Sequence, residues 1–310
     1  MNPFTDDFTR SVAALGERRL IESIRQWLGS ASPPPPRGIG DDCAVLPPSA
    51  RGRQLLLTVD SVIYGKHFDS SLPARAAGAK LLKRNVSDLA AMGGRPTAAV
   101  VALSFDPRVG RKWLEEFYRG LAACARAWKV PVVGGDVAQA DGVVVASLTL
   151  LGETAGPRAL TRAGASAGDW IYVTGALGNS VATGHHHAFA PRLREGAWLA
   201  RQSSVRAMID VSDGLAKDLP AITPPGCAPA LSAGAIPRRR GASLAAALSE
   251  GEDYELLFAV AAKGGRSAFE RIWKRAFPRL RLTCIGRFFP LSEIPSGAFD
   301  LGSLSGYEHL

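Results

Sequence analysis

Seven of the sixteen aspartates in this 310-residue chain lie where an apolar, strand-like run meets a Gly or Ser turn. They are Asp41, Asp42, Asp60, Asp88, Asp136, Asp210 and Asp213. Carboxylates brought together repel one another and resist ionisation unless cations lie between them. Hard divalent ions take oxygen ligands, and Mg²⁺ commonly bridges carboxylates to substrate phosphates. If the seven side chains converge, the pattern predicts a site for Mg²⁺ and a polyphosphate.

The same aspartates also have a purely structural interpretation. Asp is favoured in turns and at helix N-caps, because its side chain accepts hydrogen bonds from nearby backbone N–H groups. Asp41 and Asp88 in particular are open to this interpretation. Spacing along the chain does not decide between the two, since convergence depends on the tertiary structure.

Two of these junctions carry further features of a phosphate site. In Gly134-Gly135-Asp136 we expect a glycine turn whose N–H groups can approach phosphate oxygens. In the segment 210–214, Asp-Val-Ser-Asp-Gly, a strand should end and a helix begin, with Asp213 beside the helix N-terminus. The sequence contains neither GxxxxGK[ST] nor a GxGxxG that follows a strand. The site would therefore use neither a P-loop nor a dinucleotide-binding turn.

Composition narrows the class of protein. Lys and Arg number 37 and Asp and Glu 28, which gives a net charge of +9, and 46% of the residues are hydrophobic. This is a globular composition with a length typical of two domains. No apolar run reaches the ~18 residues of a membrane span, and the polar start shows no secretory signal. The four cysteines form no CxxC pair, so we expect no zinc site. We expect a cytoplasmic protein.

The basic charge by itself permits nucleic-acid binding. However, the chain has no recognised binding motif, and its basic clusters lack interleaved aromatic residues. We therefore expect small-molecule partners, with no nucleic acid and no membrane. Two clusters, the histidines 185–187 and the arginines 238–240, are interpreted as structural or solvated surface groups.

The aspartates must be positioned by strands and helices that the hydrophobic pattern predicts. Strands are expected at 54–59, 97–105, 130–133, 143–151, 169–174, 207–209, 254–260 and 281–288. Helices are expected at 8–28, 73–92, 111–129, 213–219 and 267–277. This alternation predicts an α/β fold of the α+β type. A stretch rich in Gly, Pro, Ala and Ser, at 153–168, divides the chain into domains 1–153 and 154–310.

Eight motifs, taken in order, resemble those of the thiamine-monophosphate kinase family, in the aminoimidazole-ribonucleotide-synthetase-like ATP-binding superfamily. They are GIGDDCAVL, TVDSVIYGKHF, NVSDLAAMGGRP, VVGGDV, LTRAGASAGDWIYVTGALGNS, IDVSDGLAKDL, GEDYELLF and GYEHL. They extend from about residue 38 to residue 307. The resemblance implies a PurM-like architecture, with an N-terminal ATP- and Mg²⁺-binding domain that forms a homodimer. The C-terminal domain would complete the nucleotide and substrate site.

The resemblance also implies the reaction. The γ-phosphoryl group of ATP would pass directly, in line, to thiamine monophosphate, with several Mg²⁺ ions bound. The product would be thiamine diphosphate, at the last step of its biosynthesis. Because the acceptor phosphate oxygen is already a nucleophile, we assign no general base.

Roles can be carried over to the residues that match the motifs. The implied metal ligands are Asp42, Thr58, Asp60, Asp88, Asp136, Asp210 and Asp213, with Asp210 and Asp213 also implied in catalysis. The implied ATP contacts are Gly135, Asp136, Arg162 and Ser212, and the implied substrate contacts are His67, Glu252 and Tyr307. Asp41 is expected to be a neighbour of the ligands. The segments 184–210 and 220–249 are short for the family, and both lie where the acceptor pocket would be completed.

Two alternatives remain open at this stage. The chain could be a different ATP-dependent enzyme of the same superfamily, although it lacks the reactive N-terminal or C-terminal cysteine expected of two such relatives. It could also be a non-catalytic relative that binds thiamine phosphates, although all the matching aspartates are present.

Overall fold

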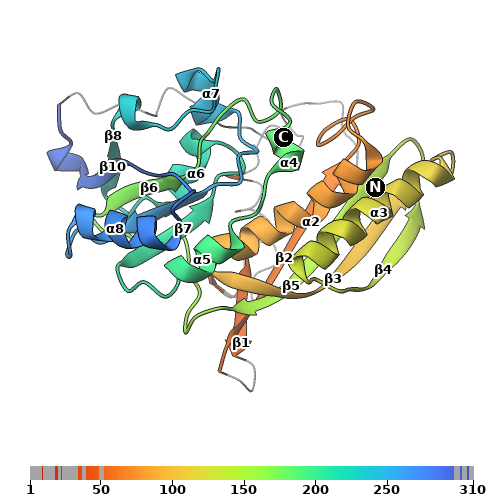
Figure 1. Cartoon of the computed structure of the whole chain (residues 1–310), viewed down its shortest axis with the longest axis horizontal. Coiled ribbons are helices and arrows are strands. Elements are labelled where there is room, and N and C mark those ends of the chain that lie inside the picture. The colour runs from red at the N-terminus through yellow and green to blue at the C-terminus, as the bar shows by residue number, and fades with distance from the viewer. Residues whose placement is uncertain are drawn as a thin grey trace.

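The computed structural model describes residues 34–36, 40–48 and 52–296, with the single positions 9, 18, 19, 22, 301 and 306. Within these residues the chain forms two five-stranded sheets that lie side by side, each covered by helices (Figure 1). The α/β fold class is thereby confirmed. Most of the helix expected at 8–28, and the implied substrate contact Tyr307, lie outside the described residues.

The first sheet has the strand order β1-β2-β5-β3-β4. Its strands are β1 (Ala44–Pro48), β2 (Gln54–Ile63), β3 (Gly94–Phe105), β4 (Val132–Gln139) and β5 (Val144–Thr154). The β3–β4 pair is parallel and the other pairs are antiparallel. Helices α2 (Ala74–Ala91) and α3 (Arg111–Trp128) lie over one face of this sheet (Figure 1).

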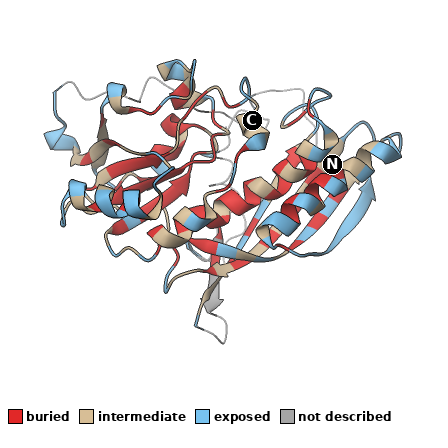
Figure 2. Cartoon of the chain, viewed as in Figure 1, coloured by how far each residue is buried: buried red, intermediate tan, exposed pale blue. Residues whose placement is uncertain are grey.

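The two faces of the first sheet differ because side chains alternate along each strand. Leu148 and Leu150 of β5 are fully buried under the helices, in one core cluster with Leu81 of α2. On the opposite, open face Val59 is 61% exposed and Val100 is 40% exposed. Every residue of the edge strand β4 is exposed (Figure 2). One face of this sheet therefore presents apolar side chains that no described element covers.

Helices α2 and α3 approach each other closely because glycines lie at their crossing. A Cβ atom added to Gly78 would lie 2.0 Å from the carbonyl oxygen of Phe117, and one added to Gly120 would lie 1.9 Å from that of Arg75. Neither contact is possible for a larger residue without separating the helices. The glycines thus permit the close approach of α2 to α3.

The second sheet is wholly antiparallel, with the order β7-β9-β6-β10-β8. Its strands are β6 (Trp170–Thr174), β7 (Val205–Asp210), β8 (Cys227–Leu231), β9 (Leu256–Val260) and β10 (Leu282–Pro290). Its helices are α4 (His185–Ala188), α5 (Leu193–Leu199), α6 (Leu215–Ile222), α7 (Leu244–Ser249) and α8 (Arg266–Ala276). The short 3₁₀ turns are η4 (Ala233–Ala235) and η5 (Leu291–Glu293). Helices α6 and α7 share a core with one face, and α5 and α8 with the other.

Helix α2 belongs to both halves of the molecule. Its middle packs on the first sheet, whereas Ala90 and Ala91 at its end join the core cluster that contains Leu199 of α5 and Met208 of β7. Most of the helix is buried (Figure 2). Polar side chains on α2 can therefore contact residues of either half.

The helices expected at 73–92 and 111–129 agree with α2 and α3 to within one residue at each end. The strand expected at 130–133 is wrong in extent, because β4 continues to Gln139. The turn expected at Gly134-Gly135 is consequently also wrong, since both glycines pair with β3 inside a strand. A Cβ atom on Gly135 would lie 2.0 Å from the carbonyl oxygen of Val101, so this glycine permits close strand pairing. In the described part of the chain, no helix combines the length and hydropathy needed to cross a bilayer.

Candidate active site

Three aspartates from distant parts of the chain meet between the two sheets. They are Asp42, which precedes β1, Asp88, in the last turn of α2, and Asp210, at the end of β7. One carboxylate oxygen from each lies within 4.8 Å of the other two. The convergence that the sequence left undecided is thus present for these three residues, and the interpretation of Asp88 as only a cap is wrong.

Two hydroxyl groups fix the orientation of this acid cluster, which we define as Asp42, Asp88 and Asp210. Thr58 Oγ1 donates a 2.6 Å hydrogen bond to Asp88 Oδ2, and Ser87 Oγ donates a 2.5 Å hydrogen bond to Asp210 Oδ2. The first bond ties α2 to the first sheet, and the second ties α2 to β7. Each donor binds one oxygen of its carboxylate.

The cluster concentrates negative charge in a buried place. Burial raises the pKa of Asp210 to about 8, and the neighbouring carboxylate of Asp42 adds to the shift. Burial also raises the pKa of Asp88 well above its usual range, with further contributions from Asp60 and Asp210. A cation that binds between these carboxylates lowers their free energy, because it relieves their mutual repulsion.

The donor set suits a hard cation. All the convergent ligand atoms are carboxylate oxygens, which Mg²⁺ prefers, whereas zinc favours nitrogen and sulfur. The Cys43 thiol is buried beside these acids. Burial, together with the charges of Asp88 and Asp42, raises the pKa of Cys43, so the thiol stays protonated and is a poor metal ligand. The described residues therefore fit Mg²⁺.

Arg162 lies at the rim of the cluster, where its guanidinium faces Asp42 at 3.1 Å and 3.3 Å. Its backbone N–H donates to Asp41 Oδ1 at 2.7 Å. Asp41 thus anchors the chain at Arg162 and is not one of the three residues of the acid cluster. Nearly a third of the Arg162 side chain is exposed, so its remaining N–H groups can reach a ligand.

Asp60 approaches the cluster from β2 and is paired with a residue that the sequence analysis missed. Arg84 of α2 contacts Asp60 Oδ1 at 3.3 Å and donates to the carbonyl oxygen of Ser61 at 2.8 Å. The Asp60 charge contributes to the raised pKa values of Asp88 and Asp210, which places Asp60 within electrostatic range of both.

Asp213 lies in the loop that follows β7, one residue before the Gly214 cap of α6. Its carboxylate contacts Lys217 Nζ at 3.1 Å. The backbone N–H groups of Asp213 and Gly214 both donate to the buried carboxylate of Asp218, at 3.1 Å. Asp218, which the sequence analysis did not single out, therefore fixes this loop. The carbonyl oxygen of Ser212 accepts the N–H of Glu252, at 2.7 Å.

His67 and Glu252, the implied substrate contacts, are joined by a third residue. Lys80 Nζ donates to the carbonyl oxygen of His67 at 2.8 Å and contacts Glu252 Oε1 at 2.6 Å. The two residues come from different halves of the chain, and the structure brings them to the same ammonium group.

Gly135 and Asp136 are not brought to the cluster. In the sheet, Asp60 pairs with Leu148, Leu148 with Val101, and Val101 with Gly135. Three strand spacings separate β2 from β4, about 14 Å. Two ligands of one Mg²⁺ ion lie within about 4 Å of each other. The Asp136 carboxylate is exposed and makes no ion pair with any described residue.

Three of the residues that the sequence analysis missed lie on α2 and share one pattern with Asp88. Lys80, Arg84, Ser87 and Asp88 occur at i, i+4, i+7 and i+8, which places them on one face of a helix. Polar residues at the spacing of a buried helical face are a signal of a site, because such groups are buried only with partners. Only Asp88 was recognised.

The interpretation of the arginines 238–240 as solvated surface groups is wrong for Arg239. Arg239, expected in a solvated turn, buries its guanidinium against the carboxylate of Asp253 at 2.8 Å and the carbonyl oxygen of Ala176 at 2.8 Å. It thereby anchors the loop that carries Glu252. The histidines 185–187 are partly buried, and His185 Nε2 lies 3.0 Å from the carbonyl oxygen of Asp253, which supports a structural role.

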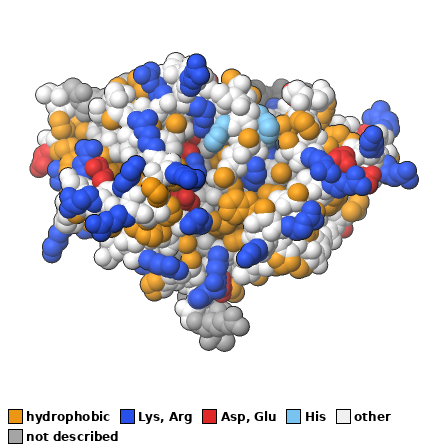
Figure 3. Space-filling model, viewed as in Figure 1, with side chains coloured by type: hydrophobic (Ala, Val, Ile, Leu, Met, Phe, Trp, Pro, Cys, Tyr) orange, Lys and Arg blue, Asp and Glu red, His pale blue; other side chains and the backbone are white. Residues whose placement is uncertain are grey.

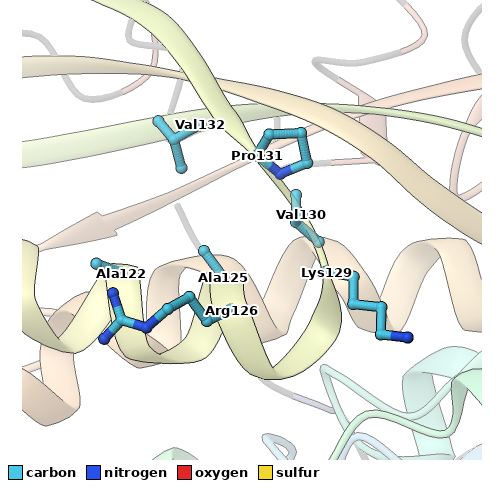
Figure 4. A pocket seen from close by; sticks show the side chains of 7 residues that line it. All are labelled: Ala122, Ala125, Arg126, Lys129, Val130, Pro131 and Val132. Atoms are coloured by element: carbon cyan, nitrogen blue, oxygen red, sulfur yellow. The ribbon is translucent and has the colours of Figure 1, made fainter.

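Other parts of the described surface are weaker candidates for a functional site. The pocket between the end of α3 and the start of β4 is lined by apolar side chains with Arg126 and Lys129, and contains no carboxylate (Figure 4). Basic side chains are spread over both halves of the face shown in Figure 3 and do not gather into one stripe. The acid cluster is therefore the best candidate site in the described residues.

Comparisons with known proteins identify the family of this chain. Residues 40–154 match the family "AIR synthase related protein, N-terminal domain". The chain is 34% identical to the thiamine-monophosphate kinase of Salmonella typhimurium over 327 residues, which cover 96% of this chain and 98% of the relative. It is 33% identical to that of Escherichia coli K12 over 276 residues, covering 80% and 83%.

Solved structures give the same result. A structure described as AaThiL complexed with AMPPCP and TMP superposes with a TM-score of 0.80 at 28% identity, over 98% of this chain and 100% of that one. The thiamine-monophosphate kinase of Stenotrophomonas maltophilia K279a gives a TM-score of 0.67 at 32% identity, over 87% and 92%. The hydrogenase maturation protein HypE, at 18% identity and a TM-score of 0.63, shares the fold. This chain belongs to the thiamine-monophosphate kinase family.

Proposed function

We propose that this protein phosphorylates thiamine monophosphate to thiamine diphosphate, using ATP and Mg²⁺, as the last step of thiamine diphosphate biosynthesis. One observation carries the proposal: carboxylates from residues 42, 88 and 210 converge within 4.8 Å between the two sheets. The similarity to thiamine-monophosphate kinases over nearly the whole chain supports the identity of the acceptor.

In this proposal the acid cluster holds Mg²⁺, with Thr58, Asp60 and Asp213 as further ligands. Mg²⁺, when bound, neutralises the repulsion between the phosphates of donor and acceptor. Ser87 and Thr58 keep the carboxylates of Asp210 and Asp88 in place through the hydrogen bonds described above.

The donor nucleotide would contact Arg162 and Ser212. The planar guanidinium of Arg162 can hold two phosphate oxygens at once. Arg162 is already oriented by Asp42 and by the backbone bond to Asp41. Ser212 lies in sequence between Asp210 and Asp213, the two aspartates proposed to act in catalysis.

The acceptor would be bound by His67 and Glu252, together with Tyr307, which lies outside the described residues. Thiamine monophosphate carries a positive ring and a phosphate. The Glu252 carboxylate can bind the cationic or amine-bearing part, while the phosphate faces the metal site. The loop of Glu252 is bonded to the loop of Ser212, which links the acceptor and donor sides.

The chemical step needs no strong general base. An oxygen of the acceptor phosphate attacks the γ-phosphorus of ATP, and the bond between that phosphorus and the oxygen shared with the β-phosphate breaks. ADP leaves with the electron pair of that bond. The chain's residues contribute position and charge stabilisation, as in other phosphoryl transfers.

We further propose that the protein is a homodimer in which Gly135 and Asp136 serve the site of the partner. Asp136 lies too far from Asp60 to share an ion within one chain, as the strand pairing shows. The open face of the same sheet exposes Val59 and Val100. A second copy on that face would bury these side chains and bring its own β4 to the site.

The domain division at residues 153 and 154 and the cytoplasmic location remain part of the proposal. The division falls at the end of β5, before the first strand of the second sheet. All four cysteines are free thiols, which suits a reducing compartment.

The test is an assay of ADP release from ATP and Mg²⁺, with and without thiamine monophosphate, with the product identified by mass. We expect release that depends on the acceptor and a product of the mass of thiamine diphosphate. Nucleotide binding without turnover would keep the fold and the metal site but reject the acceptor. Absence of nucleotide binding would contradict the whole assignment.

A further inference from the structure

Lys80 is a fully buried lysine with two partners from opposite halves of the molecule. It lies on α2, and its side chain has no solvent exposure. Its ammonium donates to the carbonyl oxygen of His67 at 2.8 Å and pairs with Glu252 Oε1 at 2.6 Å. Burying an ammonium group costs several kcal/mol unless it is paired. A sequence that needed only a stable helix would place an apolar residue here.

The loop of His67 is a tight turn after β2. The backbone N–H of His67 donates to the carbonyl oxygen of Ile63 at 2.9 Å, and the N–H of Ile63 donates to His67 Nδ1 at 3.2 Å. Because Nδ1 accepts this bond, the proton of the neutral ring lies on Nε2. The turn therefore orients the His67 ring, and Lys80 contacts the carbonyl oxygen of the same residue.

The loop that carries Glu252 is hydrogen-bonded to residues 211 and 212, in the loop that follows β7. Glu252 has a positive φ of 54°, and its N–H donates to the carbonyl oxygen of Ser212. The N–H of Tyr254 donates to the carbonyl oxygen of Val211 at 2.8 Å. These bonds fix the backbone of Glu252, but they leave its side chain free to rotate. Among the described residues, the carboxylate is held by the ion pair with Lys80, and the charge of the nearby Arg84 adds to the attraction.

We propose that Lys80 is a positioning residue for the acceptor, since it holds the Glu252 carboxylate and the His67 turn at a fixed separation across the two halves of the molecule. Lys80 does not touch the reacting phosphates. It acts through Glu252 Oε1 and the carbonyl oxygen of His67, the two atoms that its ammonium contacts. The identity of the acceptor rests on the proposed function, whereas the contacts of Lys80 do not.

The test compares Lys80→Met, Glu252→Gln and the double variant with the wild-type protein. Met fills a similar volume without charge, and in the double variant neither partner leaves an unpaired buried charge. Lys83→Met is the matched control, because Lys83 lies on the same helix and donates to the carbonyl oxygen of His187 without contacting Glu252 or His67. Thermal unfolding of each variant identifies any that fails to fold.

The first readout is steady-state kinetics. We expect Lys80→Met to raise the KM for thiamine monophosphate at least tenfold, while the KM for ATP changes less than twofold and kcat less than threefold. Added to Glu252→Gln, Lys80→Met should raise the acceptor KM by a smaller factor than it does alone, because only its contact with the His67 turn remains to be lost. Effects of the two substitutions that multiply, or a Lys83→Met effect as large as that of Lys80→Met, would overturn the proposal.

The second readout needs no substrate. Hydrogen exchange of the peptide that contains residues 63–69, followed by mass spectrometry, should be faster in Lys80→Met than in the wild-type protein and unchanged in Lys83→Met. If wild type does not phosphorylate thiamine monophosphate, the proposed function fails and exchange alone decides whether Lys80 holds the turn. Unchanged exchange in Lys80→Met would overturn the positioning role, whatever the acceptor is.

Discussion

Ser87 Oγ donates a 2.5 Å hydrogen bond to Asp210 Oδ2, between residues 123 positions apart in the sequence. Ser87 lies on α2 and Asp210 ends β7, and both are buried. The bond joins the two halves of the molecule at the acid cluster. It also favours the charged form of a carboxylate that burial would otherwise keep protonated.

Replacement of Ser87 by Ala should weaken the metal site without unfolding the protein. A hydrogen bond to a charged group contributes about 1.5–3 kcal/mol, so we expect kcat to fall by at least about tenfold and the Mg²⁺ concentration for half activity to rise. A Mg²⁺ titration of the ADP-release rate measures both. Thr223→Ala is the control and should leave both values unchanged, because it removes a hydroxyl that, among the described residues, donates to the carbonyl oxygen of Leu219 away from the acid cluster.

Replacement of Asp210 by Asn should separate activity from stability. The substitution removes one charge from the acid cluster but keeps an oxygen that can accept the Ser87 bond. We expect kcat to fall at least about 100-fold, because a metal ligand loses its charge. Without metal, the melting temperature at pH 9 should rise by about 3–5 °C, because repulsion is relieved.

Asp141→Asn is the control for this charge effect. Asp141 is an exposed aspartate near β4, far from the cluster in the sheet. Its substitution should alter neither activity nor melting temperature. Activity within about threefold of wild type in Asp210→Asn would count against the assignment of the cluster.

The effect of Mg²⁺ on stability should depend on pH. Burial raises the pKa of Asp210 to about 8 in the folded protein, from an unfolded value of 3.8. In the metal-free protein, the stability that the protonated group provides is complete below pH 4 and is lost as pH rises through 8. Mg²⁺ binds the ionised cluster, so its binding should become stronger over the same interval.

We therefore expect Mg²⁺ to raise the melting temperature more at pH 9 than at pH 6. Differential scanning calorimetry with and without Mg²⁺, at constant ionic strength, measures the difference. The pH dependence should be much weaker in Asp210→Asn. If Mg²⁺ raised the melting temperature of the wild-type protein equally at both pH values, the ion would not be binding to ionised carboxylates of the cluster.

Replacement of Val59 by Arg should dissociate the proposed homodimer. Val59 is 61% exposed on the open face of the first sheet, and a charge there would be buried without a partner at the interface. We expect light scattering to give about twice the chain mass of 32.7 kDa for wild type and the single-chain mass for the variant. A monomeric wild-type protein would contradict the dimer.

A mixing experiment tests whether Asp136 acts in the partner's site. Asp136→Asn and Asp210→Asn should each be nearly inactive alone. If the two aspartates of one site come from different copies, a mixed dimer has one site with both aspartates intact. Refolding the two variants together in equal amounts should then restore about a quarter of the wild-type activity. No recovery would mean that the two aspartates serve the same chain's site.

The sequence by itself predicted the long helices of the first half and the family, but not every element. The periods of the apolar residues predicted α2 and α3 to within one residue at each end, because these patterns are local. The aspartates expected at strand ends predicted an oxygen-donor cation site, although Asp60 lies inside β2 and Asp88 inside α2. The order of eight motifs predicted the family that the comparisons then showed.

The tertiary structure decided which of these residues meet. Asp42, Asp88 and Asp210 converge because α2 packs against both halves of the molecule, and no local pattern encodes that packing. Asp136 remains apart because β4 is added to the far side of the sheet, a matter of strand order. Lys80 acquired its place between His67 and Glu252 for the same reason. Spacing along a chain fixes the face of an element on which a side chain lies, but contacts over a hundred residues apart depend on how the elements pack.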